Sequence, residues 1–331
     1  MASLFNAKYF NGEVVLESVG NIRAENKLEL VALAKRTRNS ELPSRMPDQK
    51  GGNIATIIIH GNLAGDSDNY DGETDISISE LTNYAQTVVA IGRAHAWEEE
   101  DFQESIAGYS EMDAQIYQLA IYQDKQVKAA VLSTLKGIFA TALSGKVKTI
   151  TELKEDTLID LLVEAAGDMA DEFDTVVMDS YVAGELAKKK LLSYGTYVEN
   201  GIEKQDPKVG FWSGKRVIID DVVGSNAKVA THKVYAFAPY SFEYSELAVK
   251  VPFELTRDSL KNGGVDIVVE RQRFVLAPYG VSWTSASMAK KSPTNAELET
   301  GSNWAKVKDG NNVEIEAKVI PFACLSLTLS E

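Results

Sequence analysis

The chain has 331 residues, of which 44% are hydrophobic and 25% charged, a composition that builds a large core and excludes wholesale disorder. Its length predicts two domains, or one large body with appendages. The formal net charge of −14 argues against a protein that grips nucleic acid or an anionic membrane, because both tasks need a basic face.

The single cysteine, Cys324, excludes an intrachain disulfide and a zinc site built from several thiols. Its apolar neighbours predict a small core residue. The N-terminus lacks the charged-then-apolar pattern of a signal peptide, and no apolar run is long enough to cross a bilayer. We therefore expect no membrane partner.

The first fifty residues do not resemble a domain. Residues 22–38 combine leucines with lysines and arginines, a pattern that predicts a short amphipathic helix with a basic end. Pro43 and Pro47 then keep the chain extended. Two interpretations stay open: an ordinary helix folded onto its own core, or an arm that packs on a neighbouring copy.

A long two-stranded excursion is predicted next. Residues 54–59 read as one strand, residues 75–79 alternate with period two, and residues 82–94 form the returning strand. An acidic loop rich in turn formers, residues 65–72, lies between them. Because an isolated hairpin is marginal in water, it needs a surface to lie on, from its own body or from another subunit.

Residues 109–143 contain no proline and repeat apolar residues three or four apart, which predicts one amphipathic helix of roughly 35 residues. No matching second helix follows, so we interpret it as a strut rather than a coiled coil. A mixed α/β block follows, with a helix at 157–169, a buried strand at 173–178 and a helix capped by Ser180.

The remainder is rich in predicted strands. Residues 249–256 and 265–276 form an antiparallel pair whose connection contains Asn262-Gly263-Gly264. A final strand is expected around residues 313–320.

No pattern for catalysis, cofactor binding or metal binding survives inspection. The three histidines have no metal-ligand spacing, and the acidic loop fails the register of a calcium-binding loop. The glycine-rich stretch at 210–215 is one residue too short for a phosphate-binding loop. The SxxK sequence at Ser133 lies inside the long helix, and the SDN sequence at Ser67 precedes it in the wrong order. We therefore predict no catalytic residues, no cofactor, no metal and no enzymatic activity.

The order of the pieces and several phrases resemble the major capsid proteins of tailed bacteriophages with the Hong Kong 97 fold, in particular a subgroup common in phages of Gram-positive bacteria. The phrases are Phe5–Asn11, Val89–Trp97, Leu135–Phe139, Val176–Ser180 and Arg271–Trp283. Histidine often stands in that family at the position of Ala277.

The resemblance implies an α+β capsid fold with five parts. They are an N-terminal arm (1–50), an extended β-hairpin loop (51–95), the spine helix of a peripheral domain (96–145), an axial domain (146–248), and the peripheral β-sheet with the C-terminus (249–331).

The function implied by the resemblance is that of a shell protein, which assembles through hexamers and pentamers into an icosahedral capsid around double-stranded DNA. Its partners would be itself, a separate scaffolding protein, a portal, and packaged DNA bound without sequence specificity. It would lie in the virion after assembly in the bacterial host cytoplasm. An acidic wall suits such a container, because it repels DNA at short range.

Two family features are testable on this sequence. Some members cross-link a lysine of the extended loop to an asparagine of a neighbour, but no lysine lies between Lys50 and Lys125, so we expect noncovalent contacts. Other members carry an N-terminal scaffolding region of about a hundred residues. Too little chain precedes the arm here, which favours a separate scaffolding protein.

The arm and the hairpin carry apolar side chains that a small core cannot cover, so we expect them to be buried between subunits. The predicted inter-subunit contact residues are Leu28, Leu30, Leu33, Ile57, Ile59, Tyr70, Ile76 and Ile78.

Three alternatives stay open. An encapsulin-like nanocompartment shares this fold but encloses cargo enzymes. An enzyme would have its catalytic domain at 146–248, although no motif supports it. The third is a binding or adhesion protein at the virion surface.

Overall fold

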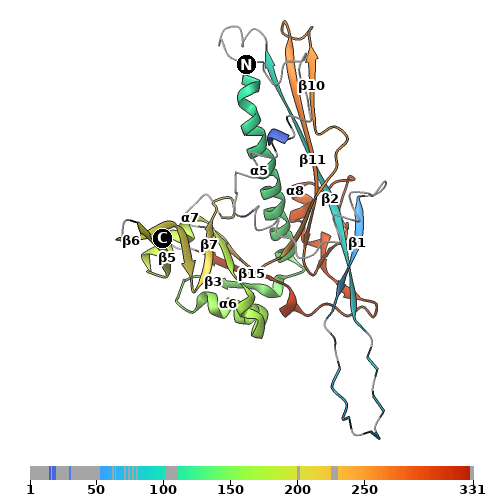
Figure 1. The fold of residues 1–331 in the computed structure, drawn as a ribbon, viewed down its shortest axis with the longest axis vertical. Coiled ribbons are helices and arrows are strands. Elements are labelled where there is room, and N and C mark those ends of the chain that lie inside the picture. Colours follow the sequence, from blue (N-terminus) through green and yellow to red (C-terminus); the bar gives the residue numbers. More distant parts are fainter. Residues whose placement is uncertain are drawn as a thin grey trace.

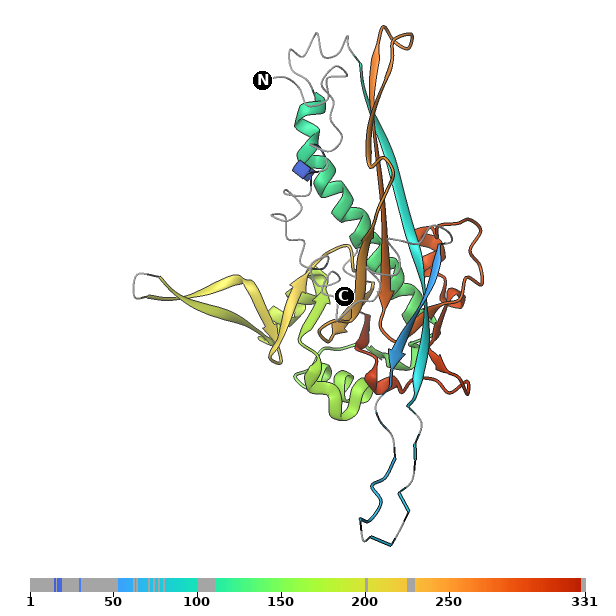
Figure 2. The same cartoon turned by 45° about the vertical axis from the view of Figure 1, so that its right-hand side comes forward.

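The computed structural model describes residues 15, 17–19, 30, 53–61, 63, 65–70, 72–73, 75–76, 78–79, 81–100, 111–199, 202–224 and 230–328, with the backbone alone for 111–117, 195–199 and 202–209. The molecule is elongated. A long helix and long strands run along its axis, an α/β unit projects to one side, and a narrow loop extends from one end (Figures 1 and 2).

One long helix, α5 (Glu111–Ala140), runs along the long axis of the molecule. It confirms the single long helix that the sequence predicts over residues 109–143. Its buried residues, among them Val127, Val131, Leu135 and Ile138, recur three or four apart and face the main core. The helix packs on α8 (Asn295–Glu299), whose N-terminus carries a capping box between Thr294 and Glu297. This apolar stripe packs the helix against the main core along much of its length.

A six-stranded sheet runs beside α5. Its path is β1-β2-β11-β10, while β9 pairs with β11 and β14 pairs with β2. The bounds are β1 Ile54–His60, β2 Asn83–Glu100, β9 Phe242–Leu247, β10 Phe253–Asp258, β11 Val265–Pro278 and β14 Lys308–Asp309. The predicted pair β10–β11 is confirmed as antiparallel. Its connection uses positive φ angles at Asn262, Gly263 and Gly264, which glycine adopts without strain.

The α/β unit is built on a seven-stranded sheet of order β3-β15-β8-β4-β7-β6-β5. The strands are β3 Val147–Ile150, β4 Thr175–Met178, β5 Leu192–Glu199, β6 Ile202–Trp212, β7 Lys215–Ile219, β8 Thr231–Phe237 and β15 Phe322–Thr328. Helices α6 (Thr157–Ala166) and α7 (Ser180–Lys188) share one core with one face of this sheet. The other face belongs to the core that contains α5.

The remaining elements are short. They are the 3-10 turns η1 Ser144–Lys146, η2 Gly167–Glu172, η3 Gly301–Asn303 and η4 Ala317–Val319, and the antiparallel strands β12 Val281–Trp283 and β13 Trp304–Lys306. Both faces of the sheet are covered, so central strand β4 is buried at every position, as the sequence predicts. Cys324 is a buried core residue as expected, and burial raises the pKa of its thiol to about 12.

The C-terminal strand is placed differently from the prediction. Residues 313–320 contain an isolated β-bridge at Glu314 and the turn η4, and the strand begins only at Phe322, after Pro321. It lies between β3 and β8 in the α/β sheet, not in the peripheral sheet assigned to residues 249–331. Its first six residues are all buried because both faces of the strand are covered. Its sequence therefore lacks the apolar–polar alternation that would reveal a strand.

Two other boundaries differ. Strand β2 continues to Glu100 because it pairs with β11 as far as Val265, so the hairpin and the next part share one strand across residue 95. Helix α7 is capped by Asp179 rather than by Ser180. The Asp179 carboxylate accepts a hydrogen bond from the Val182 amide at 2.8 Å and also contacts Nδ1 of buried His232.

Lys146, in η1, is buried beside the segment that leads into β15. It is 5% exposed, and its Nζ donates a hydrogen bond to the Ile320 carbonyl at 2.6 Å. Burial, with a smaller contribution from the charge of Lys306, lowers the pKa of Lys146 to about 8. Burying the charged form of Lys146 therefore costs free energy that the unfolded, solvated lysine does not lose.

Replacing Lys146 with Met is expected to raise the free energy of unfolding of the unassembled chain at pH 7 by about 1–3 kcal/mol. The unfolded lysine has the higher pKa, so between about pH 8 and pH 10.5 the unfolded state binds more protons and wild-type stability rises with pH. The advantage of the variant should therefore shrink across that window. Urea unfolding at pH 7 and pH 10 measures it, and a difference that does not change with pH would contradict the assignment.

Candidate assembly surface

The loop between β1 and β2 carries several of the most exposed large apolar side chains among the described residues. Strand β1 pairs with β2 from Ile54 opposite Val89 to His60 opposite Asn83, and the Gly61 amide closes the ladder on the Thr82 carbonyl at 2.8 Å. Beyond that point the chain leaves the body as a narrow projection (Figure 1, bottom). We call residues 61–82 the finger.

The finger is not the hairpin that the alternation at residues 75–79 predicts. None of its described residues belongs to a strand, and its two arms separate beyond Gly61 (Figure 2). Alternation stabilises a strand only when one face is buried, and the described finger residues have no such face in the single chain.

The finger exposes large apolar side chains to an unusual degree. Exposed fractions are 92% for Tyr70, 71% for Ile76 and 96% for Ile78, and Leu63 and Leu81 are also exposed. Ile54 and Ile58 extend this surface onto the outer face of β1. A gathering of large exposed apolar side chains on one projecting segment marks a contact site rather than ordinary surface variation.

The negative charge of the finger limits the kinds of protein surface that can pack against it. It contains Asp66, Asp68, Asp71, Glu73, Asp75 and Glu80, and neither lysine nor arginine occurs between Lys50 and Arg93. A surface that receives the finger must therefore offer apolar area and must not add further negative charge.

The predicted contact residues divide into three groups. Leu28 and Leu33 lie outside the described residues. Leu30, Ile57 and Ile59 are 2%, 4% and 8% exposed and are covered by the chain itself; Ile57 packs with Val88, Leu247 and Val275. The area that was expected to need a neighbour is therefore already buried at these three positions. Tyr70, Ile76 and Ile78 are exposed on the finger.

Sequence reasoning missed Ile54 and Ile58. The signal was present in the period-two alternation of β1, since Ile57 and Ile59 on the buried face place Ile58 on the opposite face. It also missed Leu63 and Leu81, whose neighbours show no periodicity.

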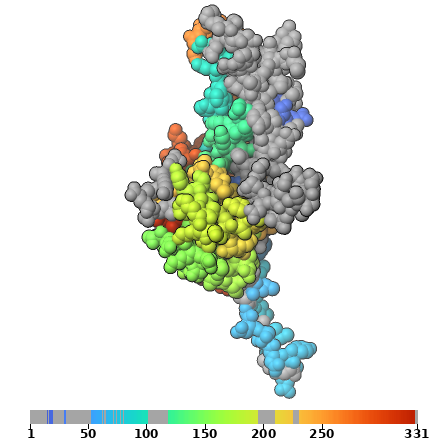
Figure 3. Space-filling model, turned by 90° about the vertical axis from the view of Figure 1, so that its left-hand side faces the viewer, coloured from blue at the N-terminus to red at the C-terminus, as the bar shows by residue number. Residues whose placement is uncertain are grey.

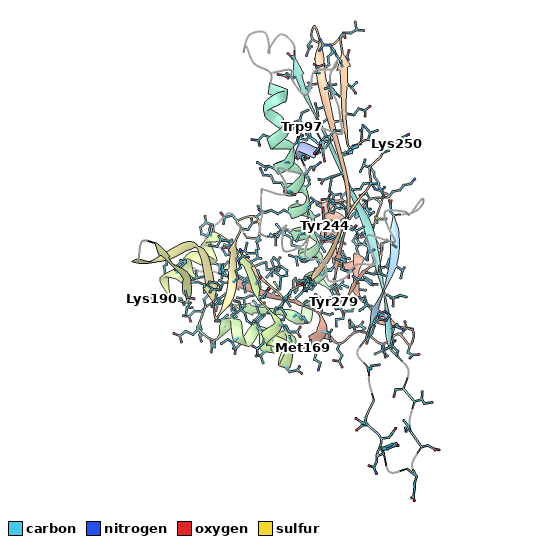
Figure 4. The ribbon with its side chains drawn as sticks, in the orientation of Figure 1. Trp97, Met169, Lys190, Tyr244, Lys250 and Tyr279 are labelled. Carbon is cyan, nitrogen blue, oxygen red and sulfur yellow. The ribbon has the colours of Figure 1, made fainter. Side chains whose placement is uncertain are left out.

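The described residues bring no catalytic group together. His60 Nδ1 lies 2.7 Å from Asn83 Oδ1, His95 packs against the rings of Trp97 and Tyr122, and His232 is buried beside Asp179. Trp97 lies between the long sheet and α5 (Figure 4). Within the described ranges, no three histidine, cysteine, aspartate or glutamate side chains are grouped to hold a metal ion.

None of the helices in the described part of the chain is long and apolar enough to cross a membrane.

Comparison with known proteins gives one clear sequence relative. The chain is 27% identical over 290 residues to the major capsid protein of Bacillus phage SPP1, covering 84% of this chain and 86% of that protein. No protein-family model matches the sequence.

Solved structures agree on the fold. The acid-stable capsid of Helicobacter pylori bacteriophage KHP30 matches with a TM-score of 0.54 at 10% identity, covering 86% of each chain. The head of Helicobacter pylori bacteriophage KHP40 matches with a TM-score of 0.52 at 10% identity, covering 84% of each chain. At such identities these matches speak for the fold alone. Together with the sequence relative, they show a chain that is similar to a phage major capsid protein and has a capsid fold of the Hong Kong 97 type.

Proposed function

We propose that this major capsid protein assembles through hexamers and pentamers into an icosahedral shell around double-stranded DNA, and that the finger is its principal contact with the neighbouring copy. The observation that carries the proposal is the exposure of Tyr70, Ile76 and Ile78 on a segment that projects from the body of the chain.

Finger-to-body contacts are heterologous, because the finger of one copy meets a different surface of the next. Such contacts form a ring when successive rotations between copies return to the first copy. Each copy then gives one finger and receives another, so every finger in a ring is buried. Weak contacts repeated in this way add up to a stable shell.

The remaining parts of the proposal rest on composition and on the family resemblance. The net charge of −14 suits a wall that encloses DNA without binding its sequence. The absence of lysine between Lys50 and Lys125 favours noncovalent contacts. We further propose a separate scaffolding protein, a portal, assembly in the host cytoplasm and no enzymatic role. A shell that encloses cargo enzymes is not favoured by the phage relative.

Sedimentation velocity and negative-stain electron microscopy of the expressed full chain test the proposal. We expect capsomers of five or six copies, or closed particles, at micromolar concentration. A compact, well-folded monomer that persists at high concentration would contradict it.

A further inference from the structure

The outer face of α6 is a surface that the proposed shell contacts leave without a role. Leu158, Leu161 and Leu162 point inward and are buried against the sheet. On the opposite side, Ile159 and Val163 are 55% and 53% exposed. Their spacing of four residues places them next to each other on one helix face.

Two surface hollows adjoin α6 beside this face, and neither is lined by Ile159 or Val163. One, of about 360 Å³, borders the N-terminal part of the helix and is lined by Lys148, Ile150 and Thr157. The other, of about 400 Å³, borders its C-terminal part and is lined by Glu164, Ala165 and Trp304. Met169, labelled in Figure 4, lies in η2 just beyond α6, and Figure 3 shows the green surface of this segment at the lower edge of the α/β unit.

Carboxylates surround the two aliphatic side chains. Those of Glu152, Glu155, Asp156, Asp160, Glu164 and Asp168 are exposed, and Lys154 is the sole basic residue between positions 152 and 172.

Lysines from other elements offset part of this charge. Lys148 pairs with Asp160 at 3.3 Å and Glu164 at 2.8 Å, Lys189 pairs with Glu152 at 3.1 Å, and Lys318 pairs with Asp168 at 3.8 Å. Glu155 and Asp156 form no ion pair with the described residues, so the surface stays acidic. An apolar pair framed by acidic groups complements a partner with an apolar stripe and basic flanks.

We propose that the outer face of α6 binds a basic amphipathic helix presented by another protein. The apolar stripe of that helix covers Ile159 and Val163, and its lysines or arginines reach the surrounding carboxylates. The proposal goes beyond shell formation and does not depend on it. The chain's own basic segment, residues 22–38, fits less well, because Leu30 of its apolar stripe is buried in the protein's core.

The probe is a fluorescent 18-residue helix of leucine and lysine with apolar residues at i, i+3, i+4 and i+7, titrated into the unassembled full chain. A scrambled peptide of the same composition and a leucine–glutamate peptide are the controls. We expect binding of the first peptide alone, weakening as salt screens the charges, with slower amide hydrogen exchange in α6.

Ile159→Gln combined with Val163→Gln should weaken binding about tenfold by removing the apolar contact while keeping a good helix former at both positions. The matched control is Ile219→Gln with Val222→Gln, which changes two residues of similar exposure, 56% and 59%, beside Asp220 and Asp221. That control should bind as the wild type does.

Glu155→Gln with Asp156→Asn tests the charge, and Asp156 makes no capping hydrogen bond that the change would remove. We expect weaker binding and a shallower salt dependence. Asp66→Asn with Asp75→Asn on the finger is the control and should change neither.

Several results would overturn the proposal. They are equal binding by the scrambled peptide, exchange protection on the finger instead of α6, and wild-type affinity in the Ile159/Val163 variant. Tight binding of a peptide of residues 22–38 that displaces the leucine–lysine helix would assign the face to a second copy and would equally reject a foreign partner. Failure of shell assembly leaves these readouts unaffected, so the two proposals fail separately.

Discussion

Replacing Tyr70, Ile76 and Ile78 together with serine is expected to abolish closed particles while leaving the thermal midpoint of the unassembled chain unchanged. The three side chains are 92%, 71% and 96% exposed, so the single chain gains nothing from them. Burial against a neighbour is worth about 1.5–3 kcal/mol for each large apolar side chain, and the loss recurs at every contact of the shell. Negative-stain microscopy and sedimentation measure assembly, and calorimetry measures the midpoint.

The matched control, Ile57→Ala, should have the opposite effects, with lower stability of the unassembled chain and normal assembly. Ile57 is 4% exposed and packs inside the chain, so Ile57→Ala should lower the free energy of unfolding by about 2–4 kcal/mol through the cavity it leaves. Particles that form at permissive temperature should look normal. If the serine variant assembles as the wild type does, the finger is not the principal contact.

Deletion of residues 1–40 would be a less selective test of assembly. Val15 and Val19 pack with Leu119 and Phe253, and Leu30 lies in the main core. The truncation would therefore uncover apolar area within the chain and confound lost stability with lost assembly. Substitutions on the finger avoid this loss of stability, because the side chains that they change are exposed in the single chain.

Replacing Gly137 with Ala is expected to destabilise the chain by about 3 kcal/mol or more. A Cβ at this position of α5 would lie 2.0 Å from the Leu298 carbonyl oxygen and 2.6 Å from Trp304 Nε1. These two atoms are joined by a buried hydrogen bond of 2.8 Å. Forcing the helices apart adds overpacking strain and breaks that bond, which outweighs the gain of about 1 kcal/mol in helix propensity.

Gly184→Ala in α7 is the natural comparison, because nothing lies within 4 Å of the position that the alanine methyl group would take. Only the propensity gain applies there, so this variant should be slightly more stable than the wild type. Urea unfolding of both unassembled variants separates the two effects. Equal stability of the two would show that α5 and α8 do not approach each other closely enough to exclude a methyl group.

Local patterns were sufficient for the elements whose residues respond to their own neighbours in sequence. The apolar repeat of α5 needed only helix geometry, and Asn262-Gly263-Gly264 indicated its turn through the backbone angles that glycine allows. The way in which these elements combine into one fold was predicted from the family resemblance, which rests on sequences such as Val89–Trp97. Composition indicated an acidic chain, and the spacing of its residues matched no motif for catalysis.

Tertiary contacts decided what no local pattern contains. Whether an isoleucine on β1 faces the core or a neighbour depends on residues far away in the sequence, since Ile57 is buried in a cluster with Val275, more than two hundred positions later. The same holds for β15, whose uniformly apolar sequence fits any doubly covered strand until β3 and β8 flank it. The sequence by itself determined the long helix α5, the turn at Asn262-Gly263-Gly264, the charge and the apolar content. Which apolar side chains remain exposed was decided only by the fold, because burial is a property of all the surfaces that meet at a residue.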